Sequence, residues 1–299
     1  MKLALGPLGY YWPKERMQAF YREVESWPLD IVYLGEVVCA KRRSFGLRDW
    51  LEAADRLAAA GKEVVLSTLA LVEAASELAM LERICRNGRY RIEANDMAAV
   101  QALSGETPFV VGPHVNCYNP MALDLLVELG AFRWVSPVEM SAESLQAMRD
   151  EHPEGVEIEV LAYGRLPLAF SARCFTARDA GLAKDRCGFR CGDFPEGLPL
   201  STQEGSALFT VNGVQLQSAL PCNLLADFPS LQARGVDVLR VMPQQQGTAD
   251  IVSAFRGVID GQSKVPEACD ALRPLSPEGY CNGYWHGEPG MLWAPTPRA

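Results

Sequence analysis

The feature that most constrains the fold of this chain is a regular alternation of short apolar segments with amphipathic segments. Apolar runs of four to eight residues are typical of buried strands, and apolar positions spaced three and four apart are typical of helices. The expected strands are residues 1–8, 30–35, 63–68, 90–94, 108–112, 132–135, 156–162 and 236–242, and the expected helices are residues 14–26, 47–60, 73–87, 97–103, 120–129, 142–149, 222–234 and 249–259.

Eight strand–helix units predict an α/β fold, a (β/α)8 TIM-like barrel. A doubly wound open sheet is the alternative, but no G-x-G-x-x-G follows the first strand. The barrel is expected as a single domain over 1–299, with a cysteine-bearing insertion after the seventh strand at about 164–204. A hairpin at 208–216 should turn at Asn-Gly, and the Pro-rich tail at about 264–299 should lie over the surface.

Charge and composition exclude several classes of protein. The formal net charge of −9 repels phosphate backbones, so no nucleic acid partner is expected. No apolar stretch reaches the ~18 residues that cross a bilayer, and Gly6-Pro7 interrupts the apolar N-terminus, so we expect no membrane span and no signal peptide. These features predict a cytoplasmic protein, in which cysteines are more often metal ligands or buried thiols than disulfides.

Four of the nine cysteines form the most informative chemical pattern. Cys39 follows the second expected strand, while Cys174, Cys187 and Cys191 lie together in the insertion after the seventh. Because the carboxyl ends of all barrel strands meet at one rim, these thiols should converge. A four-thiolate cage holds zinc or an iron–sulfur cluster, and the absence of C-x-x-C pairs favours the cluster without excluding zinc. The other cysteines are expected to be small buried side chains: Cys85, Cys117, Cys222, Cys269 and Cys281.

Basic residues crowd the same sequence neighbourhoods. They would offset the negative charge of thiolates and cluster, and some of them could hold an anionic substrate at the rim. The candidates for anion binding are Arg42, Arg43, Arg173 and Arg178. A solvated loop of charges is the simpler interpretation for Arg42 and Arg43.

Candidate catalytic residues also follow expected strands. His114 is the histidine best placed as a base, although it could equally well only hydrogen-bond within the rim. Glu36 and Glu139, together with Glu93, could face a common pocket for acid–base work, or could form ion pairs with rim arginines. A dyad of Cys117 with His114 is only weakly indicated, because no orienting group accompanies it.

Several segments resemble the U32 peptidase-like family. The stretch Glu159 to Cys174 is similar to its signature segment, with Gly164 and Cys174 matching, but Pro167 and Ala172 replace a cysteine and a glycine. These departures resemble the UbiV branch of oxygen-independent ubiquinone biosynthesis. Further similar segments are Gly-Glu-Val-Val-Cys-Ala-Lys-Arg-Arg (35–43), Val-Leu-Ser-Thr-Leu-Ala-Leu-Val (65–72), Asn-Cys-Tyr-Asn (116–119), Ser-Ala-Arg-Cys-Phe-Thr-Ala-Arg (171–178) and Cys-Asn-Gly-Tyr-Trp (281–285).

This resemblance implies a 4Fe–4S cluster on Cys39, Cys174, Cys187 and Cys191. It implies a heterodimer with a UbiU-like protein, help from a UbiT-like lipid carrier, and hydroxylation of the aromatic ring of a ubiquinone precursor without dioxygen. By extension from relatives that hydroxylate RNA, it implies prephenate as the oxygen donor. A non-catalytic iron–sulfur scaffold and a U32-type peptidase remain the alternatives.

Overall fold

A closed barrel of eight parallel strands forms the centre of the molecule. A computed structural model describes residues 1–151 and 155–295. The barrel strands are β1 (Lys2–Leu5), β2 (Ile31–Leu34), β3 (Glu63–Ser67), β4 (Arg91–Ala94), β5 (Phe109–Val111), β6 (Ala131–Val135), β7 (Glu157–Phe170) and β11 (Val238–Val241). Neighbours pair in chain order, and β11 pairs with both β7 and β1, which closes the ring.

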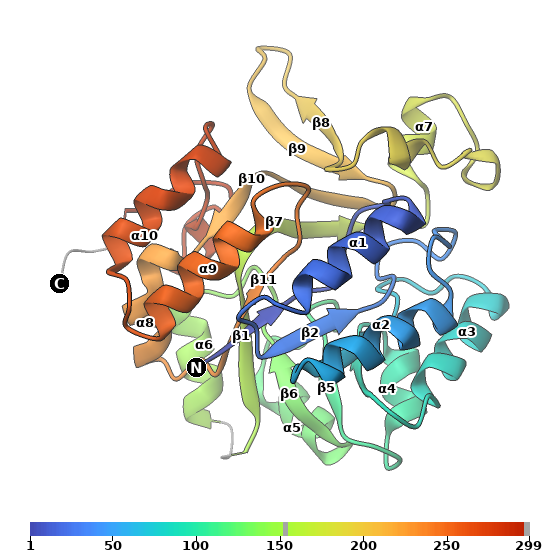
Figure 1. Ribbon diagram of the computed structural model, residues 1–299, viewed down its shortest axis with the longest axis horizontal. Helices are drawn as coiled ribbons and strands as arrows, with labels where there is room; N and C mark the ends of the chain where they lie inside the picture. The colour runs from blue at the N-terminus through green and yellow to red at the C-terminus, as the bar shows by residue number, and fades with distance from the viewer. Residues whose placement is uncertain (152–154, 296–299) are drawn as a thin grey trace.

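A helix follows each barrel strand and covers the barrel from outside (Figure 1). The helices are α1 (Lys14–Val24), α2 (Leu47–Ala59), α3 (Ala75–Cys85), α4 (Met97–Leu103), α5 (Pro120–Glu128), α6 (Ala142–Glu151), α8 (Phe228–Ala233) and α9 (Thr248–Ile259). α1 buries Met17, Phe20, Tyr21 and Val24, which recur at helical spacing. The predicted (β/α)8 fold is therefore confirmed.

Alternation along the strands separates two apolar layers. On β2, Val32 and Leu34 join the large core between barrel and helices, whereas Ile31 and Tyr33 belong to a small cluster inside the barrel. Successive strand residues point to opposite faces, so this division follows from period-two geometry. The barrel interior is thus filled by side chains rather than open.

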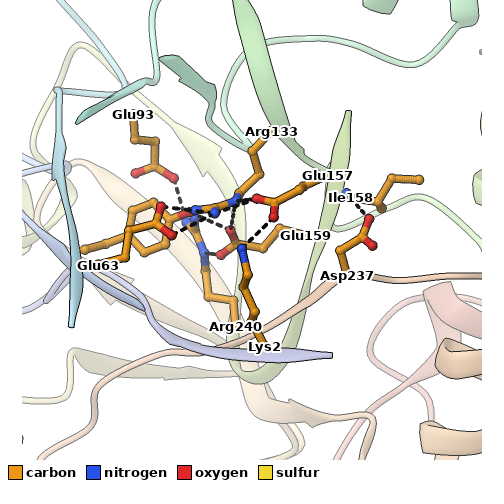
Figure 2. Close-up of polar contacts among 10 residues, drawn as sticks. Lys2, Glu63, Glu93, Arg133, Glu157, Ile158, Glu159, Asp237 and Arg240 are labelled. Carbon is orange, nitrogen blue, oxygen red and sulfur yellow. Dashed lines mark hydrogen bonds and ion pairs between the residues drawn. The ribbon is translucent and has the colours of Figure 1, made fainter. Parts of the chain in front are cut away.

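The barrel interior also contains an ion-pair network, drawn in Figure 2. Arg240 of β11 lies 2.6 Å from Glu159 and 2.7 Å from Glu93, and the hydroxyl of Tyr33 donates to Glu159 at 2.5 Å. All four side chains are almost fully buried. Burial opposes ionisation of Glu93, but the pKa of Glu93 is lowered, with the charge of Arg240 and a hydrogen bond from Asn95 at 3.1 Å acting against burial.

A second buried arginine extends this network toward the amino ends of the strands. Arg133 of β6 donates to Glu157 at 2.6 Å, lies 3.0 Å from Glu63, and donates to the Tyr33 hydroxyl at 3.2 Å (Figure 2). Lys2 donates to the other oxygen of Glu157 at 2.6 Å. The charged side chains inside the barrel therefore neutralise one another.

The seventh strand is longer than predicted, and the insertion begins later. β7 runs eight residues beyond the expected end at 162, because its second half pairs antiparallel with β10 (Gln215–Asn223), followed by β9 (Ala207–Asn212) and β8 (Leu198–Ser201). The predicted hairpin is present between β9 and β10. Between β7 and β8 lies the cysteine segment, residues 171–194, with the short helix α7 (Phe175–Asp179).

Two further expectations need correction. The helix expected at 222–234 is helical only from Leu225, because residues 221–223 continue β10 against β7. The tail at 264–299 does not simply lie over the surface: α10 (Val265–Leu272) packs against α9, and Cys281 and Trp285 are buried. Cys281 donates its backbone N–H to the carbonyl of Pro221 at 3.0 Å, which draws this segment onto β10.

The helices of the barrel are short and amphipathic. Within residues 1–151 and 155–295, no helix combines the length and the apolar character needed to cross a bilayer.

Candidate functional site

Four cysteine side chains from two distant parts of the chain line one cavity. Cys39 lies in the loop after β2, Cys174 precedes α7, and Cys187 and Cys191 lie on the short turns that follow. Figure 1 shows α7 and its loop at the edge of the barrel. All four side chains are partly exposed, and none forms a disulfide within the described chain. The structure therefore brings together the four residues that the sequence singled out.

Two features fix the loop that carries Cys39: its close packing against β3 and the carboxylate of Glu36. Gly35 has φ +148°, and a Cβ there would lie 2.3 Å from the carbonyl oxygen of Ser67, so only glycine allows this close approach. The carboxylate of Glu36 then accepts hydrogen bonds from the N–H groups of Val38 at 2.9 Å and Cys39 at 3.0 Å. Glu36 thereby orients the backbone that presents the Cys39 thiol.

Ion pairs and an aromatic stack fix the cysteine segment over this loop. Lys41 lies 2.6 Å from Asp185, and Lys184 pairs with Glu73. Phe189, in the left-handed region at φ 55°, stacks on Tyr11 with ring centroids 5.3 Å apart. These contacts bring Cys187 and Cys191 to the side of the barrel that carries Cys39.

Arg42 is a buried cation at the wall of the cysteine cavity. It is 4% exposed, and it donates to the carbonyl of Gly9 at 2.7 Å and to Oδ1 of Asn212 at 2.6 Å. The carboxylate of Glu36 is 3.9 Å away, and the Nε of Arg42 is buried without a hydrogen-bond partner in the described residues. Arg42 thus lies among the thiols with its charge only loosely compensated.

Burial and Arg42 act in opposite directions on the thiols. Burial raises the pKa of Cys191, and Arg42 partly reverses this effect. Burial likewise raises the pKa of Cys39, against a hydrogen bond from the backbone of Lys41 and the charge of Arg42. The sulfur of Cys174 accepts the N–H of Ala177 at 3.4 Å. Negative charge on these sulfurs would therefore meet N–H donors and a guanidinium.

The donor set of the cavity is four thiols, which suits either a zinc ion or an iron–sulfur cluster. Among residues 1–151 and 155–295, no three His, Cys, Asp or Glu side chains are placed to share one metal ion. A lone zinc ion needs thiolates about 2.3 Å from one point. Thiolates of a cluster bind separate irons and so stand farther apart, and four thiols line this one cavity.

The four candidate anion-binding arginines do not form one group. Arg42 is buried in the cysteine cavity, whereas Arg43, Arg173 and Arg178 are exposed. Of these exposed three, Arg43 lines a separate groove, described below. The four arginines therefore do not form a joint cationic rim.

The three candidate catalytic residues are also separated. Glu36 lies beside Arg42, and burial raises its pKa. His114 lies in a small cavity at the barrel mouth with its ring edge-on to Phe170, and burial lowers its pKa to about 4, so it is neutral at pH 7. Glu139 is exposed and accepts from the hydroxyl of Tyr118 at 3.0 Å.

A polar cavity of about 330 Å³ opens at the barrel mouth, and sequence reasoning missed most of its residues. Tyr10, Arg165, Glu196 and Gln217 line it, and Tyr10 donates to Gln217 at 3.2 Å. Arg165 follows the seventh expected strand, and a polar residue in that position of a barrel points to the functional rim. Glu196 and Gln217 come from the insertion and the hairpin, where no pattern indicates which side chains face the barrel.

Comparison with known proteins gives the family. The model of peptidase family U32 matches residues 16–294. Among solved structures, the U32 peptidase Mk0906 has 12% identity, covers 82% of this chain and 94% of its own, and has a TM-score of 0.46. A dihydropteroate synthase from Thermus thermophilus in complex with 6HMPPP has 15% identity, with 88% and 94% covered and a TM-score of 0.44. The family match spans most of the chain, which therefore belongs to peptidase family U32.

Proposed function

We propose that the chain is the iron–sulfur subunit of an oxygen-independent hydroxylase that acts on the aromatic ring of ubiquinone precursors. The observation that carries this proposal is the single cavity lined by Cys39, Cys174, Cys187 and Cys191. Membership in family U32 and the resemblance to its UbiV branch give the substrate class. The four thiols around one cavity support this function over peptide cleavage.

In this proposal the four cysteines hold a 4Fe–4S cluster. When bound, such a cluster transfers single electrons. The chain's own residues stabilise the charge: Arg42 faces the thiolates, and the N–H of Ala177 donates to Cys174. Glu36 fixes the loop of Cys39 through two backbone hydrogen bonds. The guanidinium of Arg42 and the N–H of Ala177 would meet the negative charge that ligation to a cluster places on the sulfurs.

The partners of the proposed reaction follow from its substrate. A ubiquinone precursor is very apolar, so a UbiT-like lipid carrier would deliver it, and a UbiU-like protein would complete a heterodimer. An oxygen-bearing anion, with prephenate as the candidate, would supply the oxygen. The polar cavity with Arg165 offers space and charge for such an anion at the barrel mouth.

Anaerobic purification followed by iron, sulfide and zinc analysis tests the cluster. We expect Cys39→Ala, Cys174→Ala, Cys187→Ala and Cys191→Ala each to lose iron and sulfide together with the visible absorption. Cys85→Ala removes a thiol of α3, and Cys269→Ala removes one of α10. Both variants should keep the iron, the sulfide and the visible absorption. Stoichiometric zinc without iron, or full iron in Cys39→Ala, would refute the cluster.

A non-catalytic scaffold is the first alternative, and the separation of Glu36, His114 and Glu139 favours it over a self-contained active site. A U32-type peptidase is the second alternative, and the family match supports it. Cys117 is fully buried and burial raises its pKa to about 11, which argues against a Cys117–His114 dyad. Peptide cleavage that survives Cys39→Ala combined with Cys174→Ala would favour the peptidase.

A further inference from the structure

A largely apolar groove of about 600 Å³ lies between α2, α3 and the loops after β2 and β3. This volume is within the range of small-molecule sites. Its apolar walls are formed by Phe45, Leu47, Trp50, Leu66, Met80 and Ile84. Met80 is 38% exposed, so apolar surface of the groove is open to solvent.

The groove adjoins the cysteine cavity. Lys41, Arg42 and Lys184 line both, so one layer of side chains separates the two spaces. Glu73, on the groove side, pairs with Lys184 of the cysteine segment. A molecule in the groove would therefore lie next to the four thiols.

Among the described residues, one positive charge at the groove is left without a partner. Lys41 and Lys184 are engaged in ion pairs, and Arg42 donates to Gly9 and Asn212. The guanidinium of Arg43 has no hydrogen bond or ion pair with any residue in 1–151 or 155–295. Four carboxylates also line the groove. Glu36, Glu73 and Asp185 lie beside Arg42, Lys184 and Lys41, and Glu77 accepts two backbone N–H groups. Arg43 is therefore the charge at this apolar groove that remains open to the acidic group of an apolar ligand.

We propose that this groove binds an acidic aromatic molecule that carries a prenyl-type chain. The chain would lie between α2 and α3, and the acidic group would meet Arg43. The ring would then be held at the end of the groove shared with the cysteine cavity. This inference rests on the proposed function for the class of ligand, and it assigns the apolar substrate to this chain rather than to the partner.

Calorimetric titration of the purified, iron-replete chain with 3-geranyl-4-hydroxybenzoate tests the groove. Met80→Glu places a carboxylate in the apolar wall and should weaken binding at least about tenfold. Met121→Glu makes the same change on α5, where the side chain is 83% exposed, and should leave affinity within about twofold. Equal affinity in both variants, or equal loss in both, overturns the inference.

The methyl ester of the same probe tests Arg43. Arg43→Met should weaken binding of the acid about fivefold and leave the ester unchanged, because only the acid carries a negative charge. If Arg43→Met weakens the binding of both the acid and the ester, or of neither, the assigned orientation is contradicted.

Iron analysis of the same samples separates the two proposals. Met80→Glu and Arg43→Met should keep the iron and sulfide of the wild-type chain. An iron-replete chain that binds neither probe overturns the groove and leaves the cluster standing. A chain that binds the probes but never acquires iron supports the groove and overturns the proposed cluster.

Discussion

The barrel interior and the cysteine cavity each contain a buried arginine, but the two arginines differ in how close their carboxylate partners lie. Inside the barrel, Arg240 has two carboxylates at 2.6 and 2.7 Å, so its charge is neutralised even though its Nη2 has no hydrogen-bond partner among the described residues. At the cysteine cavity, Arg42 has neutral acceptors and the carboxylate of Glu36 3.9 Å away. A buried charge that is only loosely compensated is costly, so the second arrangement is one that an added negative charge would stabilise further.

This difference separates a closed ion-pair network from an open cavity, for which we propose a binding role. The network of Arg133, Arg240, Glu93 and Glu159 is closed: each member has an opposite charge within the chain. The cysteine cavity has four partly exposed thiols, and Arg42 is the buried one among the cations that line it. In the proposed function, the negative charge of a thiolate-bound cluster would lie beside Arg42.

The largest expected effect comes from opening the closed network. Arg240→Met would leave Glu93 and Glu159 buried without their cation, and should lower the free energy of unfolding by roughly 3–5 kcal/mol. Urea unfolding measures it as a lower midpoint. Arg48→Met, at a side chain 92% exposed and paired with Glu52, should cost at most about 0.5 kcal/mol. Similar midpoints for the two variants would show that the network contributes little.

Sequence patterns predicted the barrel because each strand–helix unit can be recognised from residues that are close together in the chain. The helical spacing of Met17, Phe20, Tyr21 and Val24 and the apolar run Ile31–Leu34 need no distant partner to be recognised. The same holds for the placement of Cys39 and Cys174, since the carboxyl ends of parallel barrel strands must meet.

The parts that escaped prediction depend on partners distant in sequence. The seventh strand was expected to end at 162 and the insertion to begin at about 164. Instead, β7 continues through Gly164 and Pro167 because β10 pairs with it, with a register shift near Pro167. A Cβ at Gly164 would lie 2.6 Å from Met242, so the glycine reflects close packing rather than a turn. The pairing of Arg240 with Glu93 similarly depends on barrel closure, which no local pattern contains.

His114 lines a small cavity together with Glu93 and Arg240 of the closed network, and it gives the next largest effect. Burial lowers its pKa to about 4, with Glu93 and Arg240 as the charged groups that act on it. Between its ordinary pKa near 6.5 and about 4, the unfolded chain binds a proton that the folded chain does not, so stability falls as the pH falls.

From pH 7 to pH 5, this histidine should account for about 1–2 kcal/mol of lost stability. The measurement is urea unfolding of the wild-type chain and of His114→Gln at both pH values. The variant should lose that much less between them. Parallel losses in the two proteins would place the His114 ring in water.

The smallest effect on global stability is expected at the polar contacts that fix the cysteine segment. Lys184→Met removes the ion pair with Glu73 and a hydrogen bond to the carbonyl of Ala172 at 2.9 Å. Such partly exposed contacts contribute less than about 1 kcal/mol. They nevertheless hold Cys187 and Cys191 over the loop of Cys39, so amide exchange in residues 184–191 should quicken while the urea midpoint stays nearly constant.

Lys264→Met is the matched change, because that side chain is 83% exposed and lies 4.0 Å from Glu267 on α10. It should alter neither the midpoint nor exchange in the cysteine segment. If Lys184→Met behaves like Lys264→Met, the segment is fixed by packing such as the Phe189–Tyr11 stack instead. If it lowers the midpoint as far as Arg240→Met does, the open cavity and the closed network are one cooperative unit, and the contrast between them disappears.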